Sequence, residues 1–273
     1  MFLQRTPAAP LRLFIARLWA SDAACDGPAT GPALSERVLP TGLMHVVVRL
    51  TDRPLYVRDP NAAARLAVPP CLVGGARSDF YSRESAAPSS SVGAVLWPGA
   101  AVLLFGIGAD ELAQRHTSLQ DLWGSHADRL RAELCELRTA EARLARFEAR
   151  LGERLPLLRG LHPEAANLMR WVHMAPSVGA AVRESGLSHR AFIAHFRRHV
   201  GLAPKTWLQV RRFQRALHAM RLDPAAPLAD VAAAAGYSDQ SHFGREFMAL
   251  AGATPAGYRR RSPSEANHLP VAT

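Results

Sequence analysis

Hydrophobic and polar positions follow the same pattern twice in the last third of the chain. The first copy runs from Val178 to Trp207 and the second from Leu228 to Tyr258. Ten positions agree in kind, with an offset of 50 residues up to a glycine and of 51 after it, which indicates an internal repeat. The matching pairs are Val178/Leu228, Ala181/Val231, Val182/Ala232, Ser185/Ala235, Gly186/Gly236, Phe192/Phe243, Phe196/Phe247, Gly201/Gly252, Pro204/Pro255 and Trp207/Tyr258.

Each copy predicts a helix-turn-helix. A short helix of small residues is followed by a glycine, Gly186 or Gly236, which permits a sharp change of direction. Ser188 or Ser238 then stands where an N-cap is expected. Two phenylalanines four residues apart mark the buried face of the second helix.

The outward face of each second helix is rich in hydrogen-bonding side chains. In this motif the second helix enters the major groove of DNA, where Arg pairs with guanine, Gln with adenine, and an apolar side chain can touch a thymine methyl. We therefore predict eight DNA-contacting residues: His189, Arg190, Ile193 and Arg197 in the first copy, and Gln240, Ser241, His242 and Arg245 in the second.

A single helix is predicted between the two copies, over residues 204–220. Its apolar stripe comprises Trp207, Val210, Phe213, Leu217 and Met220. A helix of about 16 residues is about 24 Å long, so it can hold the two motifs at a fixed separation. Arg211, Arg212 and Arg215 lie off the stripe and either contact phosphate or pair with acids. The candidate phosphate contacts are Lys205, Arg211, Arg259 and Arg260.

The first part of the chain shows short β-like runs and then helical spacing. Residues 44–50 are the clearest strand, and the weaker runs are bounded by Pro, Gly or Asp. From about residue 109 to 155 leucines recur at helical spacing, with Ser118 and Asp121 suited to an N-terminal cap. This leucine stripe either docks within the chain or pairs two chains, and the sequence leaves both open. Pro163 opens one further predicted helix.

The predicted fold class is α+β, with two domains. Residues 1–158 form a β-rich sandwich or barrel with following helices, which we expect to be regulatory. Residues 159–262 form an all-α domain with two helix-turn-helix motifs and a linker helix, and residues 263–273 form a flexible tail.

Charge favours a polyanionic partner for the second domain. The net charge is +10, from 33 basic and 23 acidic residues. Up to residue 160 there are 19 Arg against 16 acids, a surplus of 3, whereas residues 161–273 hold 13 Arg and one Lys against 7 acids, a surplus of 7. A basic domain suits nucleic acid. Together with the repeat, this disfavours the alternative of a plain helical bundle with a solvated polar face.

Residues 168–260 resemble the DNA-binding domain of the AraC/XylS family of bacterial transcription regulators. The resemblance is carried by GLSHRAFIAHFRRHVGLAPKTWLQVRRFQRAL and, more specifically, by PLADVAAAAGYSDQSHFGREFMALAGATPAGYRR. It implies a sequence-specific regulator that binds double-stranded DNA and contacts RNA polymerase in the cytoplasm. Arg245 falls where the family usually has a basic residue. Ala194 and Ile193 depart from the family's polar residues, so Arg190 and His189 are the stronger candidates in the first copy.

The first domain resembles the N-terminal sensing or dimerising domains of such regulators, which implies a small-molecule effector or a homodimer. Its candidate pocket residues are Trp19, His45, Tyr81 and Trp97, each an aromatic side chain near a β-like run that could equally belong to the core. The sequence alone identifies neither the effector nor the promoter, and it fits activation and repression equally.

The sequence contains none of the motifs that would indicate an enzyme. Cys25, Cys71 and Cys135 are far apart, which disfavours a repair enzyme with reactive or zinc-bound cysteines and favours free thiols in a reducing cytoplasm. His116 and His126 have no partner at metal spacing, and we expect neither a metal nor another cofactor. An interaction protein that has lost DNA binding is disfavoured by the basic surplus. We expect neither a signal peptide nor a membrane span, since apolar runs are interrupted by Arg, Pro and Gly.

Overall fold

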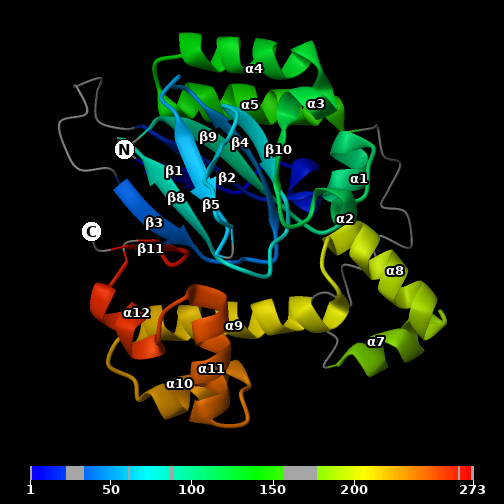
Figure 1. Ribbon diagram of the computed structural model, residues 1–273. Coiled ribbons are helices and arrows are strands. Elements are labelled where there is room, and N and C mark those ends of the chain that lie inside the picture. The colour runs from blue at the N-terminus through cyan, green and yellow to red at the C-terminus, as the bar shows by residue number, and fades with distance from the viewer. Residues whose placement is uncertain are drawn as a thin grey trace.

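Two antiparallel sheets form the first part of the computed structural model, which describes residues 2–22, 34–60, 62–86, 89–155, 177–263 and 265–271 (Figure 1). The six-stranded sheet has the order β1-β2-β9-β4-β7-β10, and the five-stranded sheet has the order β11-β3-β8-β5-β6. The strands are β1 (Phe2–Arg5), β2 (Ile15–Ser21), β3 (Leu34–Val38), β4 (Met44–Arg49), β5 (Leu55–Arg58), β6 (Leu66–Ala67), β7 (Cys71–Gly74), β8 (Tyr81–Ser85), β9 (Ser91–Leu96), β10 (His116–Ser118) and β11 (His268–Pro270).

Strand alternation places a core on each face of the six-stranded sheet. Met44, Val46 and Val48 of β4 are buried against the helices that follow the strands. Val47, on the opposite face of β4, packs against the core that contains Tyr81 of the five-stranded sheet. The predicted β-rich sandwich with following helices is therefore confirmed.

Helices cover the outer face of the six-stranded sheet (Figure 1). They are α3 (Leu119–Trp123), α4 (Ser125–Glu136) and α5 (Ala140–Arg154), preceded in the chain by α1 (Ala100–Phe105) and α2 (Ala109–Leu112) and, after β1, by a 3-10 turn (Leu11–Leu13). The predicted cap is confirmed, since Ser118 Oγ accepts a hydrogen bond from Gln120 N at 3.2 Å. Gly124 interrupts the helical stretch with a positive φ of 57°. Leu130, Leu134, Leu144, Phe147 and Leu151 are all buried in the sheet's core, so the leucine stripe docks within the chain.

The described residues 177–261 contain helices and turns and no strand, in agreement with the predicted all-α domain. Its helices are α7 (Val178–Ser185), α8 (His189–Val200), α9 (Pro204–Leu222), α10 (Leu228–Ala235), α11 (Gln240–Ala251) and α12 (Pro255–Arg261). The predicted linker helix is α9, with its five stripe residues buried. The predicted domain boundary near 158 and the helix expected after Pro163 lie outside the described residues. Within the described ranges, no helix combines the length and apolar character that crossing a membrane requires.

The first helix-turn-helix shares its core with the first domain. Phe192, Phe196 and Trp207 belong to the same buried cluster as Ala76 and the sheet's residues. Gly201, with φ of 88°, lets the end of α8 approach α2, since an added Cβ would lie 3.0 Å from the carbonyl oxygen of Ala109. The two parts therefore pack as one body at this point.

The C-terminal segment is not the flexible tail that composition predicted. Residues His268–Pro270 form β11, which pairs antiparallel with β3 at the edge of the five-stranded sheet. The backbone N–H of Leu39 donates to Asn267 O at 2.8 Å, and that of Val271 donates to Ser35 O at 3.0 Å. Leu269 is fully buried in the core of the second motif. Backbone pairing and one leucine thus tie the segment to both domains.

We predict that Leu269→Ala destabilises the protein by about 2–5 kcal/mol, because it leaves a cavity in a core that both domains share. Chemical denaturation of the full chain measures the change. Leu66→Ala is the matched control, since Leu66 is 65% exposed, and we expect a change within about 0.5 kcal/mol. Equal effects of the two substitutions would show that burial of the Leu269 side chain does not stabilise the folded state.

Candidate nucleic-acid interface

The two predicted recognition helices, α8 and α11, begin at polar caps. Ser188 Oγ accepts a hydrogen bond from Ala191 N at 3.3 Å, which confirms it as the cap of α8. The cap of α11 is Asp239, whose Oδ1 accepts from His242 N at 2.6 Å, so the prediction of Ser238 is wrong. The extra residue of the second copy falls in this turn, so the offset of 51 aligns Asp239 with Ser188.

Local contacts keep the cap of α11 charged. The hydrogen bond from the His242 backbone, with a second from the Ser238 hydroxyl, lowers the pKa of Asp239. The Ser238 hydroxyl donates to Asp239 Oδ2 at 3.0 Å. An ionised carboxylate at this end also favours the helix dipole.

The turns and the buried faces of both motifs follow the prediction. Gly186 and Gly236 have φ of 68° and 89°, a region that L side chains rarely adopt. The four phenylalanines of α8 and α11 are buried. In the second motif the Phe243 and Phe247 rings meet edge to face, with 5.5 Å between their centroids. The Phe247 ring also meets that of Phe213 on α9, with 5.1 Å between centroids. Each recognition helix is thus fixed on α9 by its aromatic face.

The outward faces carry the residues predicted to contact DNA. His189, Arg190, Arg197, Gln240, Ser241 and Arg245 are exposed, whereas Ile193 and His242 are half-buried. The offset of 51 gives equivalent places to Arg190 and Ser241, Ile193 and Gly244, Ala194 and Arg245, and Arg197 and Met248. The two exposed faces therefore differ in where they place charge and where they place apolar groups.

Two further residues of α11, Met248 and Gly244, lie at outward positions and were not among the predicted contacts. Met248 is 43% exposed and lies one helical turn from Arg245 on the same face. Gly244 stands beside Arg245, and a Cβ added there would meet nothing within 4 Å. The offset of 51 was the available signal, because it aligns both with outward positions of α8, Ile193 and Arg197.

His242 makes contacts within its own motif. Its Nδ1 lies 3.1 Å from Ser238 Oγ, and its Nε2 lies 3.6 Å from Glu246 Oε2. The His242 ring also meets Tyr237 edge to face at 5.3 Å. These contacts orient the start of α11, so His242 supports the outward face of this helix as well as bordering it.

A buried ion pair joins α9 to α11. Arg212 donates from Nε to Glu246 Oε1 at 3.1 Å and from Nη2 to Oε2 at 2.7 Å, a bidentate arrangement. Glu246 is 8% exposed, and the guanidinium of Arg212 lies over the Tyr237 ring at 4.8 Å. Of the two roles that the sequence left open for Arg212, pairing with an acid is the one observed.

The candidate phosphate contacts divide into two kinds. Lys205 and Arg260 are exposed. Arg211 lies over the Trp207 ring at 4.8 Å, and burial lowers its pKa. Arg259 is half-buried, with Nε and Nη2 sheltered and without a hydrogen-bond partner among the described residues. Lys205 and Arg260 are thus the more accessible cations.

The candidate pocket residues of the first domain are only partly brought together. Cross-strand pairing places Trp19 and His45 on the face of the six-stranded sheet that opposes the five-stranded sheet, where Tyr81 packs. His45 lies over Gly74, where an added Cβ would meet its ring at 2.8 Å. Burial, and then nearby positive groups, lower the pKa of His45 to about 4, so it is neutral at pH 7. Trp97 lies apart, between β9 and α1.

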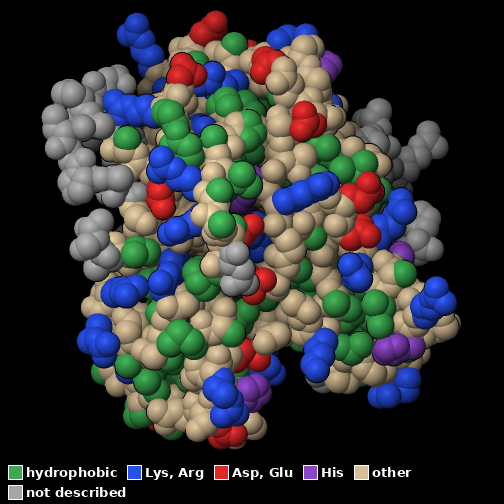
Figure 2. All heavy atoms as spheres, viewed as in Figure 1, with side chains coloured by type: hydrophobic (Ala, Val, Ile, Leu, Met, Phe, Trp, Pro, Cys, Tyr) green, Lys and Arg blue, Asp and Glu red, His purple; other side chains and the backbone are tan. Residues whose placement is uncertain are grey.

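The two motifs form separate lobes on the surface. In Figure 2 the lobe made by α10–α12 and the lobe made by α7 and α8 are divided by a notch at the lower edge of the molecule. Basic side chains lie on both lobes (Figure 2). This arrangement offers two cationic surfaces to one extended polyanion.

Comparison with known proteins agrees with this geometry. Residues 181–261 match a family described as "Helix-turn-helix domain". The chain carries an AraC-type helix-turn-helix domain. This AraC-type domain is the DNA-binding domain of a transcription regulator. Residues 3–118 match a family described as "Domain of unknown function (DUF6597)", and no curated protein matches the chain.

Solved structures similar to the chain include ToxT from Vibrio cholerae. An apo ToxT variant is 10% identical, with a TM-score of 0.46, over 95% of this chain and 97% of that chain. A second crystal form of ToxT is 9% identical, with a TM-score of 0.44, over 95% of this chain and 98% of that chain.

We predict that Arg212→Ala destabilises the AraC-type domain by about 3–5 kcal/mol, because it leaves the buried Glu246 carboxylate without its partner. Thermal and urea unfolding of the full chain measure the loss. Arg150→Ala, which breaks exposed pairs with Glu133 and Glu153, is the control, with an expected loss below about 1 kcal/mol. If the losses matched, the Arg212–Glu246 pair would not stabilise the position of α11.

Proposed function

We propose that this chain is a sequence-specific regulator that inserts α8 and α11 into successive major-groove segments of one promoter site. The observation that carries the proposal is the repeat itself: two motifs present outward polar faces and are joined by a single helix. The eight predicted contacts and the two added ones, Gly244 and Met248, then choose the sequence. Phosphate contacts by Lys205 and Arg260 would set the register without reading bases.

The length of α9 suits this mode of binding. At 1.5 Å per residue, its 19 residues span about 28 Å. Major-groove segments on one face of B-DNA recur about every 34–36 Å, and each recognition helix extends sideways from α9. An unbroken helix limits the bending between the motifs, so a single chain can engage both segments.

The unlike faces of the two recognition helices favour an asymmetric site. α8 offers Arg190 and Arg197 on either side of the apolar Ile193. α11 offers Arg245 between Gly244 and the exposed Met248. Arginine favours guanine and apolar groups favour thymine methyls, so the two DNA elements should differ in sequence.

The first domain is proposed to modulate binding through its contacts with both motifs. The first motif shares a core with Ala76 and Ala109, and the second is tied to the five-stranded sheet through β11. A signal that favours one arrangement of these contacts would shift the population that binds DNA. A small-molecule effector, RNA polymerase and a second copy of the chain are the partners we propose for this regulation.

We predict that Arg245→Ala weakens binding to a duplex site selected from random DNA by the full chain by about 1–3 kcal/mol and relaxes preference at one base pair, because it removes a base-edge contact. Fluorescence anisotropy with the selected site and its single-base variants measures both effects. Arg138→Ala is the control: it removes an exposed arginine between α4 and α5, away from the motifs. Unchanged affinity and preference in Arg245→Ala would show that α11 does not read bases through this residue.

We predict that Gly244→Ala stabilises the fold yet weakens DNA binding. Alanine is favoured over glycine within a helix by about 1 kcal/mol, and an added Cβ meets nothing in the protein. In the groove, the same methyl group would occupy space next to Arg245. Unfolding and DNA titration on one preparation separate the two effects.

Gly179→Ala is the matched control, an exposed helical glycine on α7 outside the reading faces. It should leave DNA affinity unchanged. An affinity of Gly244→Ala equal to that of the unsubstituted chain would indicate that this part of α11 does not approach DNA closely.

A further inference from the structure

Two histidines stand one helical turn apart on α8. His195 and His199 are separated by four residues, so their side chains project from the same face of the helix. Their ring centroids lie 4.5 Å apart, with an angle of 58° between the ring planes. Among the described residues, no other two histidines are four positions apart in the sequence. We call His195 and His199 the α8 histidine pair.

The separation of the two rings suits binding to one metal ion. An imidazole nitrogen binds an ion such as Zn²⁺ at about 2.0–2.1 Å, which places the ring centroid about 3.2 Å from the metal. Two rings at about 90° around the metal then have centroids about 4.5 Å apart, whereas tetrahedral positions separate them by about 5.2 Å. The observed 4.5 Å matches the square-planar or tetragonal arrangement. Nitrogen ligands in that arrangement are typical of Ni²⁺ and Cu²⁺.

Contacts with the first domain orient the His199 ring. Its Nδ1 is shielded from solvent and lies 3.8 Å from the place that a Cβ would take at Gly99. The Gly99 N–H donates to the carbonyl oxygen of His199 at 2.8 Å, which holds the end of α8 beside that glycine. Nε2 of His199 is therefore the nitrogen available to an ion. His195 and His199 are both half-buried, so the pair keeps an accessible side.

The electrostatic environment of the pair also admits a cation. His199 lies in the last turn of α8, where free carbonyl groups give the helix end a partial negative charge. Arg197 projects from the outward face of α8, away from the pair. The side chain of Arg198 lies beside Gly108, and the carboxylate of Asp110 lies beside the same glycine. The positive charge of Arg198 thus has an acidic group close by.

The pair was not considered when the sequence was taken to lack a metal site. That expectation rested on the three cysteines and on His116 and His126. The described residues contain no group of three or more side chains able to hold a metal. Two imidazoles one helical turn apart can still bind one ion together, with water at its other positions. The α8 histidine pair is therefore a two-ligand site, open to solvent.

We propose that His195 and His199 together bind a divalent transition metal of the nickel and copper class. The bound ion would join two successive turns of α8 and so stabilise the C-terminal half of that helix. Neither histidine is among the eight predicted DNA contacts. The proposal therefore stands on the geometry of the pair and is independent of the proposed function.

Calorimetric titration of the full chain with Ni²⁺, without a histidine tag and near neutral pH, tests the site. Ni²⁺ is preferred to Cu²⁺ as the probe, because Cu²⁺ can oxidise the exposed thiol of Cys135. We expect saturable binding of one Ni²⁺ per chain and an unfolding temperature that rises with Ni²⁺ concentration. Absence of saturable binding at millimolar Ni²⁺ would overturn the proposal.

His195→Asn and His199→Asn locate the site. Each variant leaves one imidazole of the pair, so we expect each to weaken Ni²⁺ binding about tenfold or more, because the second nitrogen no longer binds as an intramolecular ligand. The double variant should bind little more weakly than either single one. Unfolding without metal checks that each variant is folded. Affinities equal to that of the unsubstituted chain in both single variants would show that the ion lies elsewhere.

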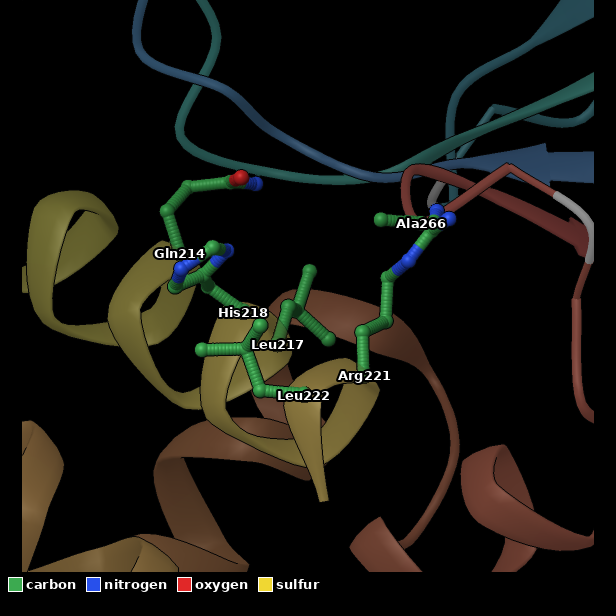
Figure 3. Close-up of a pocket in the computed structure, with 6 residues that line it drawn as sticks. All are labelled: Gln214, Leu217, His218, Arg221, Leu222 and Ala266. Atoms are coloured by element: carbon green, nitrogen blue, oxygen red, sulfur yellow. The ribbon is translucent and has the colours of Figure 1, made fainter. Parts of the chain in front are cut away.

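His218→Asn is the matched control. His218 is a single imidazole on α9, and Figure 3 shows it lining a hollow beside that helix. Gln214 and Leu222, four positions before and after it, supply no second imidazole. We expect this variant to bind Ni²⁺ as the unsubstituted chain does. If it weakened binding as much as His195→Asn, the ion would be held by scattered surface histidines and the assignment to α8 would be wrong.

Discussion

The unbroken helix α9 is the element on which the other parts of the structure depend, because one apolar stripe serves two cores. Trp207 and Val210 are buried with the first motif and the first domain, whereas Phe213 and Leu217 are buried with the second motif. A helix is stiff over 19 residues, so the position of one core fixes the position of the other. The separation of the two recognition helices is therefore a consequence of side-chain packing along a single segment.

Packing to the first domain adds a second constraint on each motif. α8 lies against α1 and α2, and the backbone N–H of Gly99 donates to His199 O at 2.8 Å. The second motif is held through Gly252, whose carbonyl oxygen accepts from Arg37 and whose backbone lies against Phe80. In the proposed mode of regulation, these contacts would carry a change in either sheet to the outward faces of α8 and α11.

Periodicity in the sequence was sufficient to predict the helical part. The stripe of α9, the paired phenylalanines and the glycine turns each follow from local spacing, and all appear as expected. The cap of α11 was placed one residue early at Ser238, because the change of offset from 50 to 51 does not show on which side of the cap the extra residue falls. The turn geometry shows that Asp239 Oδ1 accepts from the His242 N–H. Gly244 and Met248 were not among the predicted contacts, because neither residue type signals base contact by itself.

Long-range pairing was beyond the reach of local pattern. The three residues of β11 are too few to show a hydrophobic periodicity, and they form a strand only because their backbone pairs with the edge strand β3. The leucines of α4 and α5 left docking and dimerisation equally open until the sheet was present to bury them. His45 and Tyr81 lie between the two sheets because of the order of the strands. Trp97 was chosen on the same ground, as an aromatic residue near a β-like run, and it lies elsewhere.

The measurement that tests the central claim most directly is selection of random duplex DNA by the full chain, followed by titration of spacing variants of the selected site. The account predicts two unlike sequence blocks whose centres lie about 10–10.5 base pairs apart, bound by one chain. Insertion of about five base pairs between them should abolish the contribution of one block, because it turns that block to the opposite face of the duplex. Enrichment of a single block, or equal affinity after the insertion, would contradict simultaneous reading by α8 and α11.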